Sequence, residues 1–164
     1  MTPNGFVVDQ VAFVVPDLAA ALPAYDAIFS GSPWRIWDYG PSVMSEQAFR
    51  GEPSAYSMRL ALSATRPQVE LIQPLHGRSV YSEWLERGGT GVHHVGMFVD
   101  DIGEASDALG LPLATAAQTG SGYGAGGDGG FAYFDAVPEV DLILELIAVP
   151  QTRRPPDTVW ERTH

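Results

Sequence analysis

The sequence of 164 residues contains no cysteine and no lysine, so all nine of its basic residues are arginines. Without cysteine there can be no disulfide, no thiolate metal ligand and no thiol nucleophile. Without lysine there can be neither a Schiff-base lysine nor a phosphate-binding loop of the type that ends in one.

Positive charge and long apolar runs are also scarce. The net charge is −11, which argues against binding to nucleic acid or to an anionic membrane, where Lys and Arg must neutralise phosphates. There is no stretch of about 18 apolar residues that would span a membrane, and the N-terminus lacks the basic and apolar regions of a signal peptide. With 45% hydrophobic residues, the composition predicts a globular, cytoplasmic protein.

An internal repeat organises the chain. VDQVAFVVPDLAAAL (8–22) aligns with VHHVGMFVDDIGEAS (92–106), and in both copies a strand-like run meets an aspartate suited to cap the following helix. Later in each half, VELI matches LELI, so that each half closes on a strand with one glutamate. Two βαβββ modules are therefore predicted, at about 7–74 and 91–149, joined by a linker helix within 75–90.

The remaining segments fill in these modules. Pro23 should kink or shorten the first helix. The Gly-rich stretch 119–130 is too irregular for a helix or strand and is a candidate flexible lid, and residues 151–164 should form an extended C-terminal arm. Interior strands are expected at 34–37 and 56–62 in the first module, and in the second at 111–117, a weak signal, and 131–135.

Four polar residues stand in strands that otherwise look buried. Glu145 shares one face of its closing strand with Ile143 and Ile147, and Glu70 shares a face with Ile72. Gln10 and His94 occupy matching positions of the two opening strands. A buried carboxylate without a partner is costly. A divalent metal held by Gln10, Glu70, His94 and Glu145 would compensate it, and this ligand set suits Zn²⁺, Fe²⁺, Mn²⁺, Ni²⁺ or Co²⁺. Alternatively, the glutamates are solvated or ion-paired and His94 is structural.

Four motifs that together span about 7–149 point to a known family: DQVAFVVPDLAAAL, QVELIQP, GVHHVGMFVDDI and FAYFDAVPEVDLILELI. They resemble the vicinal oxygen chelate superfamily, which includes glyoxalase I, methylmalonyl-CoA epimerase, extradiol dioxygenases and bleomycin-resistance proteins, and are most similar to the epimerase and glyoxalase I-like branch. The resemblance implies an α+β fold, in which two βαβββ modules form a cup-shaped mixed β-sheet with helices on the convex side. It also implies one divalent metal ion in the cup, with His94 rather than His93 as ligand, and a homodimer.

The resemblance also implies a reaction. In this family the metal chelates two neighbouring substrate oxygens and stabilises the charge that forms when a proton leaves the carbon next to a carbonyl. We therefore expect a metal-dependent, glyoxalase-like isomerase, epimerase or lyase acting on a small-molecule substrate, with Glu145 as the first choice of catalytic base and Glu70 as the second. A protein that sequesters a small molecule and an Fe-dependent oxygenase are the alternatives, although the single histidine of the set counts against ring cleavage.

Further residues are candidates for substrate contacts. If the apolar face of 56–62 packs under helices, Arg59 points into the cup and can hold a carboxylate or phosphate; otherwise it forms a structural ion pair. Phe98, Tyr133 and Ile143 are candidates for an apolar substrate pocket, or for plain core. Trp160 in the arm is a candidate contact with a partner chain.

Overall fold

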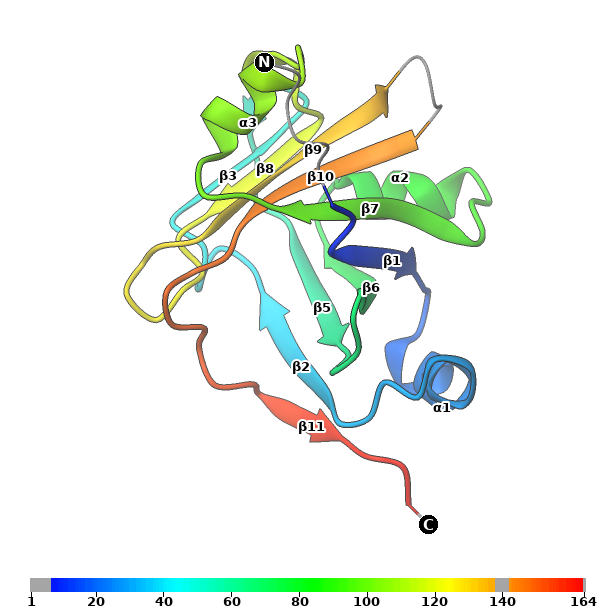
Figure 1. Cartoon of the computed structure of the whole chain (residues 1–164). Coiled ribbons are helices and arrows are strands. Elements are labelled where there is room, and N and C mark those ends of the chain that lie inside the picture. Colours follow the sequence, from blue (N-terminus) through cyan, green and yellow to red (C-terminus); the bar gives the residue numbers. More distant parts are fainter. Residues whose placement is uncertain (1–6, 138–141, 164) are drawn as a thin grey trace.

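The two halves of the sequence meet at their first strands. In the computed structural model, which describes residues 7–137 and 142–163, β1 (Gln10–Val14) pairs antiparallel with β7 (Val92–Phe98). Each opening strand also pairs in parallel with the closing strand of its own half, β1 with β6 (Gln68–His76) and β7 with β10 (Leu142–Ala148). The strands β6, β1, β7 and β10 therefore lie side by side at the centre of the sheet (Figure 1).

Within the described residues, seven further strands extend this centre to a sheet of eleven, in the order β11-β2-β5-β6-β1-β7-β10-β9-β8-β3-β4. They are β2 (Trp34–Tyr39), β3 (Glu46–Phe49), β4 (Glu52–Pro53), β5 (Ser57–Leu62), β8 (Gln118–Ser121), β9 (Gly130–Val137) and β11 (Thr158–Trp160). The helices of this part of the chain are α1 (Leu18–Phe29), α2 (Val80–Glu86) and α3 (Ile102–Ala108), with a 3₁₀ turn at Leu113–Thr115. None of them is long and apolar enough to cross a membrane. The sheet is mixed and open, so the predicted α+β fold is confirmed.

Alternation along the strands divides the apolar side chains between two faces of the sheet. On the outer face, α1 packs over Leu71 of β6 and α3 packs over Leu146 of β10. On the inner, concave face, α2 buries Val80 and Tyr81 in a cluster that includes Tyr133. The expectation of helices on the convex side therefore holds for α1 and α3 but not for α2, which belongs to the linker.

The second module differs locally from the prediction. Residues 111–117 do not form a strand but contain the 3₁₀ turn, and the strand expected there is β8, whose last three residues belong to the Gly-rich stretch. Gly120 permits this, because a Cβ there would lie 2.4 Å from Cζ of Phe131 on the neighbouring strand β9. The glycines that suggested irregular structure thus include one that lets an aromatic ring pack against a strand.

The first module also differs in two places. Helix α1 continues through Pro23 to Phe29; Pro23 and Ala19 are both exposed, so water can reach the Ala19 carbonyl that loses its helical donor. The strands β3 and β4 were not predicted, because their sequence is largely polar. β3 pairs with β8 of the second half, so the first half builds one edge of the second.

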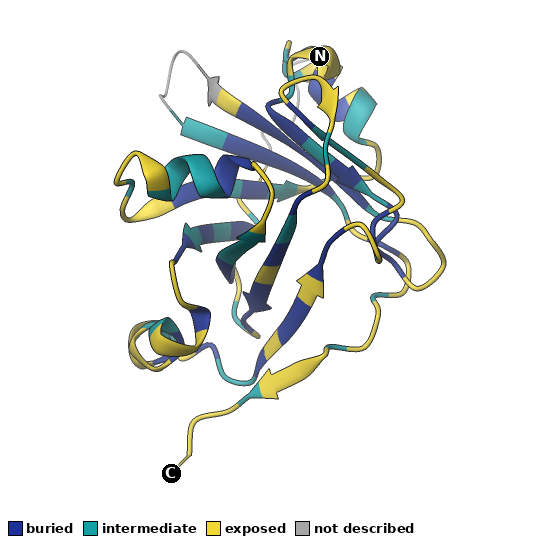
Figure 2. Cartoon of the chain, turned by 180° about the vertical axis from the view of Figure 1, so that it is seen from behind, coloured by how far each residue is buried: buried dark blue, intermediate teal, exposed yellow. Residues whose placement is uncertain are grey.

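The C-terminal arm returns to the first half of the sheet. β11 pairs antiparallel with β2 at an exposed edge (Figure 2), and Trp160 packs against the outer apolar cluster of its own chain. In α1, the buried Asp26 carboxylate accepts hydrogen bonds from Trp34 Nε1 at 3.0 Å and from Arg162 Nε at 2.8 Å. Asp26 therefore fastens the end of the arm to the first helix.

Asp26→Ala should lower the free energy of unfolding by about 3 kcal/mol, because it leaves buried donors such as Trp34 Nε1 without a partner. Urea unfolding followed by far-UV circular dichroism measures this change. Asp17→Ala is the matched control: it removes one exposed N-cap hydrogen bond, to Ala20 N at 3.0 Å, and should cost about 1 kcal/mol. Equal losses for the two variants would contradict the anchoring role of Asp26.

Candidate metal centre

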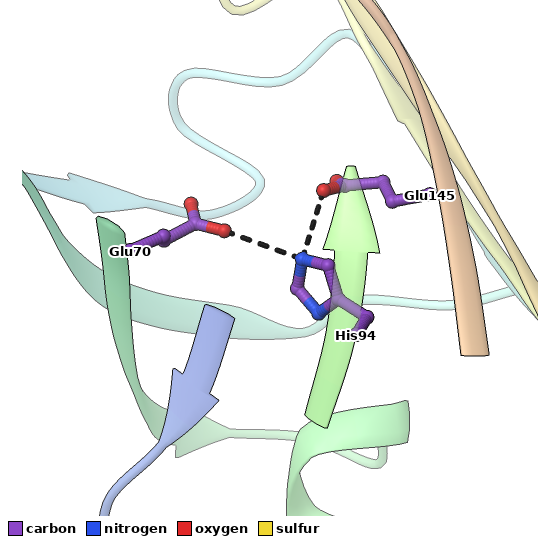
Figure 3. Close-up of side chains that lie close together, drawn as sticks. All are labelled: Glu70, His94 and Glu145. Carbon is purple, nitrogen blue, oxygen red and sulfur yellow. Dashed lines mark ion pairs between the residues drawn. The ribbon is translucent and has the colours of Figure 1, made fainter. Parts of the chain in front are cut away.

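Polar side chains from the four central strands converge on the concave face. Nε2 of His94 lies 3.0 Å from Oε2 of Glu145 and 3.5 Å from Oε2 of Glu70 (Figure 3). One ligand atom from each of the three residues lies within 4.8 Å of the others, and none of the three side chains is more than 8% exposed. The imidazole thus faces two carboxylates that reach it from different halves of the fold.

Gln10 of β1 completes the group. Its Oε1 lies 3.1 Å from Oε2 of both Glu70 and Glu145, and its Nε2 donates to Oε1 of Gln68 at 2.9 Å. Three acceptor oxygens then face one another with no hydrogen between them, which is unfavourable unless a cation lies among them. Turning the amide over lets Nε2 donate to both carboxylates, but sets its Oε1 against Oε1 of Gln68 unless that amide turns too.

Gly96 leaves the space that the Gln10 side chain occupies. It pairs with Gln10 across β1 and β7, and a Cβ at this glycine would lie 3.0 Å from Gln10 Oε1 and 2.9 Å from Ile147 Cδ1. These contacts are closer than side-chain carbons normally approach. A side chain at position 96 would therefore push the amide away from the carboxylates.

A β-bulge turns His93 towards His94. Ala12 of β1 pairs with His94 and Phe13 pairs with Val92, so His93 is the extra residue of β7. Nδ1 of His93 lies 2.8 Å from Nδ1 of His94. When Nδ1 of His94 donates in this bond, its Nε2 is unprotonated and free to bind a metal. The ring of His93 also packs against Tyr81 and Trp84 of the linker helix α2. Simple alternation along a strand cannot anticipate the bulge that brings His93 next to His94.

The electrostatics of the cluster favour a positive charge at its centre. Burial alone would lower the pKa of His94, but the carboxylates of Glu145 and Glu70 outweigh it and raise that pKa to about 9. Burial raises the pKa of Glu70, and the charge of Glu145 raises it further against the opposing hydrogen bond from His94. Burial and the charge of His94 lower the pKa of His93 to about 3. The two carboxylates therefore hold a proton on His94, and a divalent ion would neutralise them more completely.

The donor set fits a divalent cation. It offers one imidazole nitrogen, one amide oxygen and two carboxylate oxygens, a combination that suits borderline and hard metals. Among the described residues, the buried Nε2 of His94 has no hydrogen bond of good geometry despite its short distances to the carboxylates. The structure thus brings together the four residues predicted to be metal ligands, and their role as ligands stays a prediction.

A small cavity lies beside these side chains. Its volume is about 30 Å³, room for about two water molecules. Glu70 and Glu145 line it, as does Tyr133, one of the predicted substrate contacts, whose ring lies edge-on to the ring of His94 at 4.9 Å. The Tyr133 hydroxyl is hydrogen-bonded to that of Tyr81 at 2.9 Å, and burial raises the pKa of both well above their usual value. Both hydroxyls therefore stay protonated.

The other three predicted substrate contacts do not line this cavity. Ile143 packs against the inner apolar cluster, and Phe98 is 36% exposed at the end of β7. Arg59 is exposed on the outer face, where Nε and Nη2 each donate to Asp38 at 2.6 Å. The apolar face of β5, including Leu60, lines the cup instead of packing under helices, so the expectation that Arg59 points into the cup is wrong.

One cationic residue at the cavity was not predicted. Arg153 of the C-terminal arm lines the same cavity as Glu70 and Glu145. Its segment, QTRRPPD, shows no helical or strand periodicity that would place it. Its position depends on contacts between the arm and distant strands, which the local sequence does not reveal.

The fold and the site together define a class of protein in which two repeated βαβββ modules bring side chains that could hold a metal to the seam between them. A family model described as the Glyoxalase/Bleomycin resistance protein/Dioxygenase superfamily matches residues 9–134. The chain belongs to this superfamily, and the predicted resemblance is confirmed. No curated protein sequence matches the chain.

Solved structures with a similar fold share little sequence with this chain. A hypothetical protein, BH1468 from Bacillus halodurans C-125, is 17% identical with a TM-score of 0.63, over 92% of this chain and 99% of its own. Methylmalonyl-CoA epimerase from Streptomyces coelicolor, as an S115T variant in complex with 2-nitronate-propionyl-CoA, is 13% identical with a TM-score of 0.57, over the same shares of the two chains. The epimerase from Mycobacterium tuberculosis is 18% identical with a TM-score of 0.55, over 92% of this chain and 95% of its own. At these identities the similarity shows the fold alone.

The metal-free protein should lose stability as the pH rises from about 6.5 to about 9. The pKa of His94 is raised to about 9 in the folded protein, compared with about 6.5 in an unfolded chain. A raised pKa contributes stability that is fully present below the unfolded value and is lost as the pH rises through the folded value. Urea unfolding at several pH values should show a loss of up to about 3 kcal/mol. His94→Gln should flatten the curve in this window, and an unchanged slope would contradict the assignment.

Gly96→Ala should weaken the binding of a divalent metal at least about tenfold, because its methyl group displaces the Gln10 amide. Isothermal titration of the purified protein with Zn²⁺ measures the affinity. Gly126→Ala is the control, since the nearest atom to a Cβ there is 3.8 Å away and far from the site. Wild-type affinity in Gly96→Ala would show that Gln10 is not a ligand.

Proposed function

We propose that this protein is a metal-dependent isomerase or lyase of the glyoxalase type, which removes a proton from the carbon next to a carbonyl group of a small substrate. The observation that carries the proposal is the convergence of two buried carboxylates on one imidazole nitrogen, beside a cavity. Membership in a superfamily that includes glyoxalases supports it. The superfamily also contains proteins with other activities, so the reaction is assigned from the site.

Gln10, Glu70, His94 and Glu145 would hold the metal. When bound, a divalent ion supplies Lewis-acid chemistry that stabilises negative charge on a substrate oxygen. Gln68 orients Gln10 by accepting a hydrogen bond from its amide, and His93 orients His94 through the bond between their Nδ1 atoms. Gln68 and His93 thus hold Gln10 and His94 in place before the substrate arrives.

Glu145 is the proposed catalytic base, with Glu70 as its counterpart. Both carboxylates line the cavity, and they approach it from β10 and β6, on opposite sides of the central pair β1 and β7. A base must come within hydrogen-bonding reach of the proton that it removes. Two carboxylates on different sides of one carbon can remove a proton from one face and return it to the other. This arrangement favours an epimerase among the isomerases.

The cavity favours a small reacting group. Its volume of about 30 Å³ and its aromatic lining, which includes Tyr133, leave little space for water. Exclusion of water strengthens the electrostatic interactions of a charged intermediate with the protein. One of the solved proteins of similar fold is a methylmalonyl-CoA epimerase in complex with methylmalonyl-CoA. At 13% identity this is a likeness of fold, and the assignment to proton transfer next to a carbonyl rests on the site.

Purified protein loaded with Zn²⁺, Ni²⁺, Co²⁺, Mn²⁺ or Fe²⁺ should exchange a proton of candidate 2-oxo acids or acyl thioesters for deuterium in D₂O. Metal analysis and nuclear magnetic resonance of the substrate measure the two steps. Glu145→Gln, tested at saturating metal, should slow the exchange by about 10²- to 10⁴-fold, because it removes the base. Glu52→Gln, at an exposed position in β4, is the control and should exchange at the wild-type rate.

Two outcomes would contradict the proposal in different ways. Failure to bind any of the five metals would reject a metal-dependent reaction. Metal binding with unchanged exchange in Glu145→Gln would reject Glu145 as the base, and the same test on Glu70→Gln then decides between the two carboxylates.

A further inference from the structure

The C-terminal arm brings a cation to the cavity. After β10 the chain runs along the Gly-rich loop and then to the outer edge of β2 (Figure 1). Arg153 forms an isolated bridge with Gly124 of that loop, and the adjacent Ala125 N donates to Thr152 O at 2.8 Å. On the other side, Trp37 Nε1 of β2 donates to the carbonyl of Arg154 at 2.9 Å. The backbone at Arg153 is therefore held from both halves of the fold.

The side chain of Arg153 lies in an aromatic setting. Its guanidinium carbon is 5.1 Å from the centre of the Trp37 ring and 5.5 Å from that of Tyr123. Nη1 donates to the Tyr39 hydroxyl at 3.1 Å. Tyr39 and Tyr123 line the same cavity as Glu70, Glu145 and Arg153 itself. The aromatic rings thus hold the guanidinium at the wall of the cavity and limit the water around it.

Arg153 differs from four other arginines that contact the body of the fold. Arg50, Arg59, Arg78 and Arg162 each form an ion pair with a carboxylate, whereas in the described part of the chain Arg153 forms none. A guanidinium has five N–H donors, and the one side-chain hydrogen bond found here for Arg153 uses a single donor. Its remaining donors are free for a ligand, and their planar arrangement matches a carboxylate or phosphate.

The charges around the cavity point to a negatively charged ligand. Glu70 and Glu145 together cancel the charge of a divalent ion, and His94 is neutral when it binds a metal. Arg153 then leaves the metal-loaded cavity with one positive charge. In a site of low dielectric constant such a charge interacts strongly with an anion.

We propose that Arg153 binds an anionic oxygen group of the substrate, a carboxylate or a phosphate, that is distinct from the carbonyl group at which the proton is removed. The substrate is thus a small anionic carbonyl compound, and the C-terminal arm, rather than the βαβββ modules, selects it. This inference rests on the proposed function for the location of the reacting carbonyl. The binding of the anion by Arg153 can be tested without turnover.

Three metal-chelating hydroxamates distinguish binding to the metal from binding of an anionic group by Arg153. Acetohydroxamate is uncharged apart from its chelating group, succinate monohydroxamate adds a carboxylate, and phosphonoacetohydroxamate adds a phosphonate. Each is titrated into the Zn²⁺-loaded full chain, with the affinity measured by calorimetry and by tryptophan fluorescence. At least one of the two anionic probes should bind about tenfold tighter than acetohydroxamate, and the tighter one identifies the anionic group.

Arg153→Met should abolish that preference and leave the affinity for acetohydroxamate unchanged. Arg153→Lys, which keeps the charge but not the planar donors, should retain part of it. Arg154→Met, at the exposed neighbouring position, is the matched control and should keep the full preference. Far-UV circular dichroism and urea unfolding establish that each variant is folded.

Two results would overturn the inference: equal affinity of the wild type for all three probes, or an equal loss of affinity for all three in Arg153→Met, which would show a structural role. If the protein takes up no metal, the proposed function fails separately. Titration of the metal-free chain with succinate and with inorganic phosphate then decides the inference. Binding that Arg153→Met abolishes supports it, and no binding overturns it.

Discussion

The structure depends on the burial of two like-charged carboxylates at the seam between its two halves. Glu70 and Glu145 lie close to one imidazole nitrogen, and each is flanked in its strand by apolar residues. Two carboxylates in such a place repel each other and lose their hydration. They are tolerated because positive charge is held between them, by a proton on His94 or by a cation. The two halves must therefore join so that both carboxylates face this positive charge.

Several local features follow from this constraint. Gly96 lacks a side chain so that the Gln10 amide can reach the carboxylates. The bulge at His93 supplies a hydrogen-bonding partner for the second nitrogen of His94 from the adjacent residue. Gln68 accepts a hydrogen bond from the Gln10 amide and so directs the amide oxygen of Gln10 inward. Each feature helps the cluster to hold a cation between its two carboxylates.

The arm adds a second level of organisation. It is fastened through Asp26 at one end and through the Gly-rich loop at the other, and between these points it brings Arg153 to the cavity wall. The repeated modules supply the groups that fit a metal and a proton transfer, while a segment outside the repeat contributes the group that fits an anion. Reaction and selectivity are in this way assigned to different parts of the chain.

The sequence by itself determined the two-module plan and the four candidate ligands. Period-two alternation showed that Glu70 and Glu145 stand on apolar strand faces, and the repeat showed that Gln10 corresponds to His94. Alternation is a local property of each strand, and the repeat is a comparison between the two halves of the sequence. They survive folding because β1 pairs with β6, and β7 with β10, without a break in register.

Only the tertiary structure decided which side chains surround the cluster. Arg59 lies outside because the apolar face of β5 lines the cup, and either face of that strand could have done so. His93 turns inward because of a bulge, which depends on pairing with a strand more than 80 residues away. Arg153 reaches the cavity because the arm pairs with β2 and with the Gly-rich loop. Alternation reports only that two faces differ; which face becomes the interior is decided by packing between distant segments.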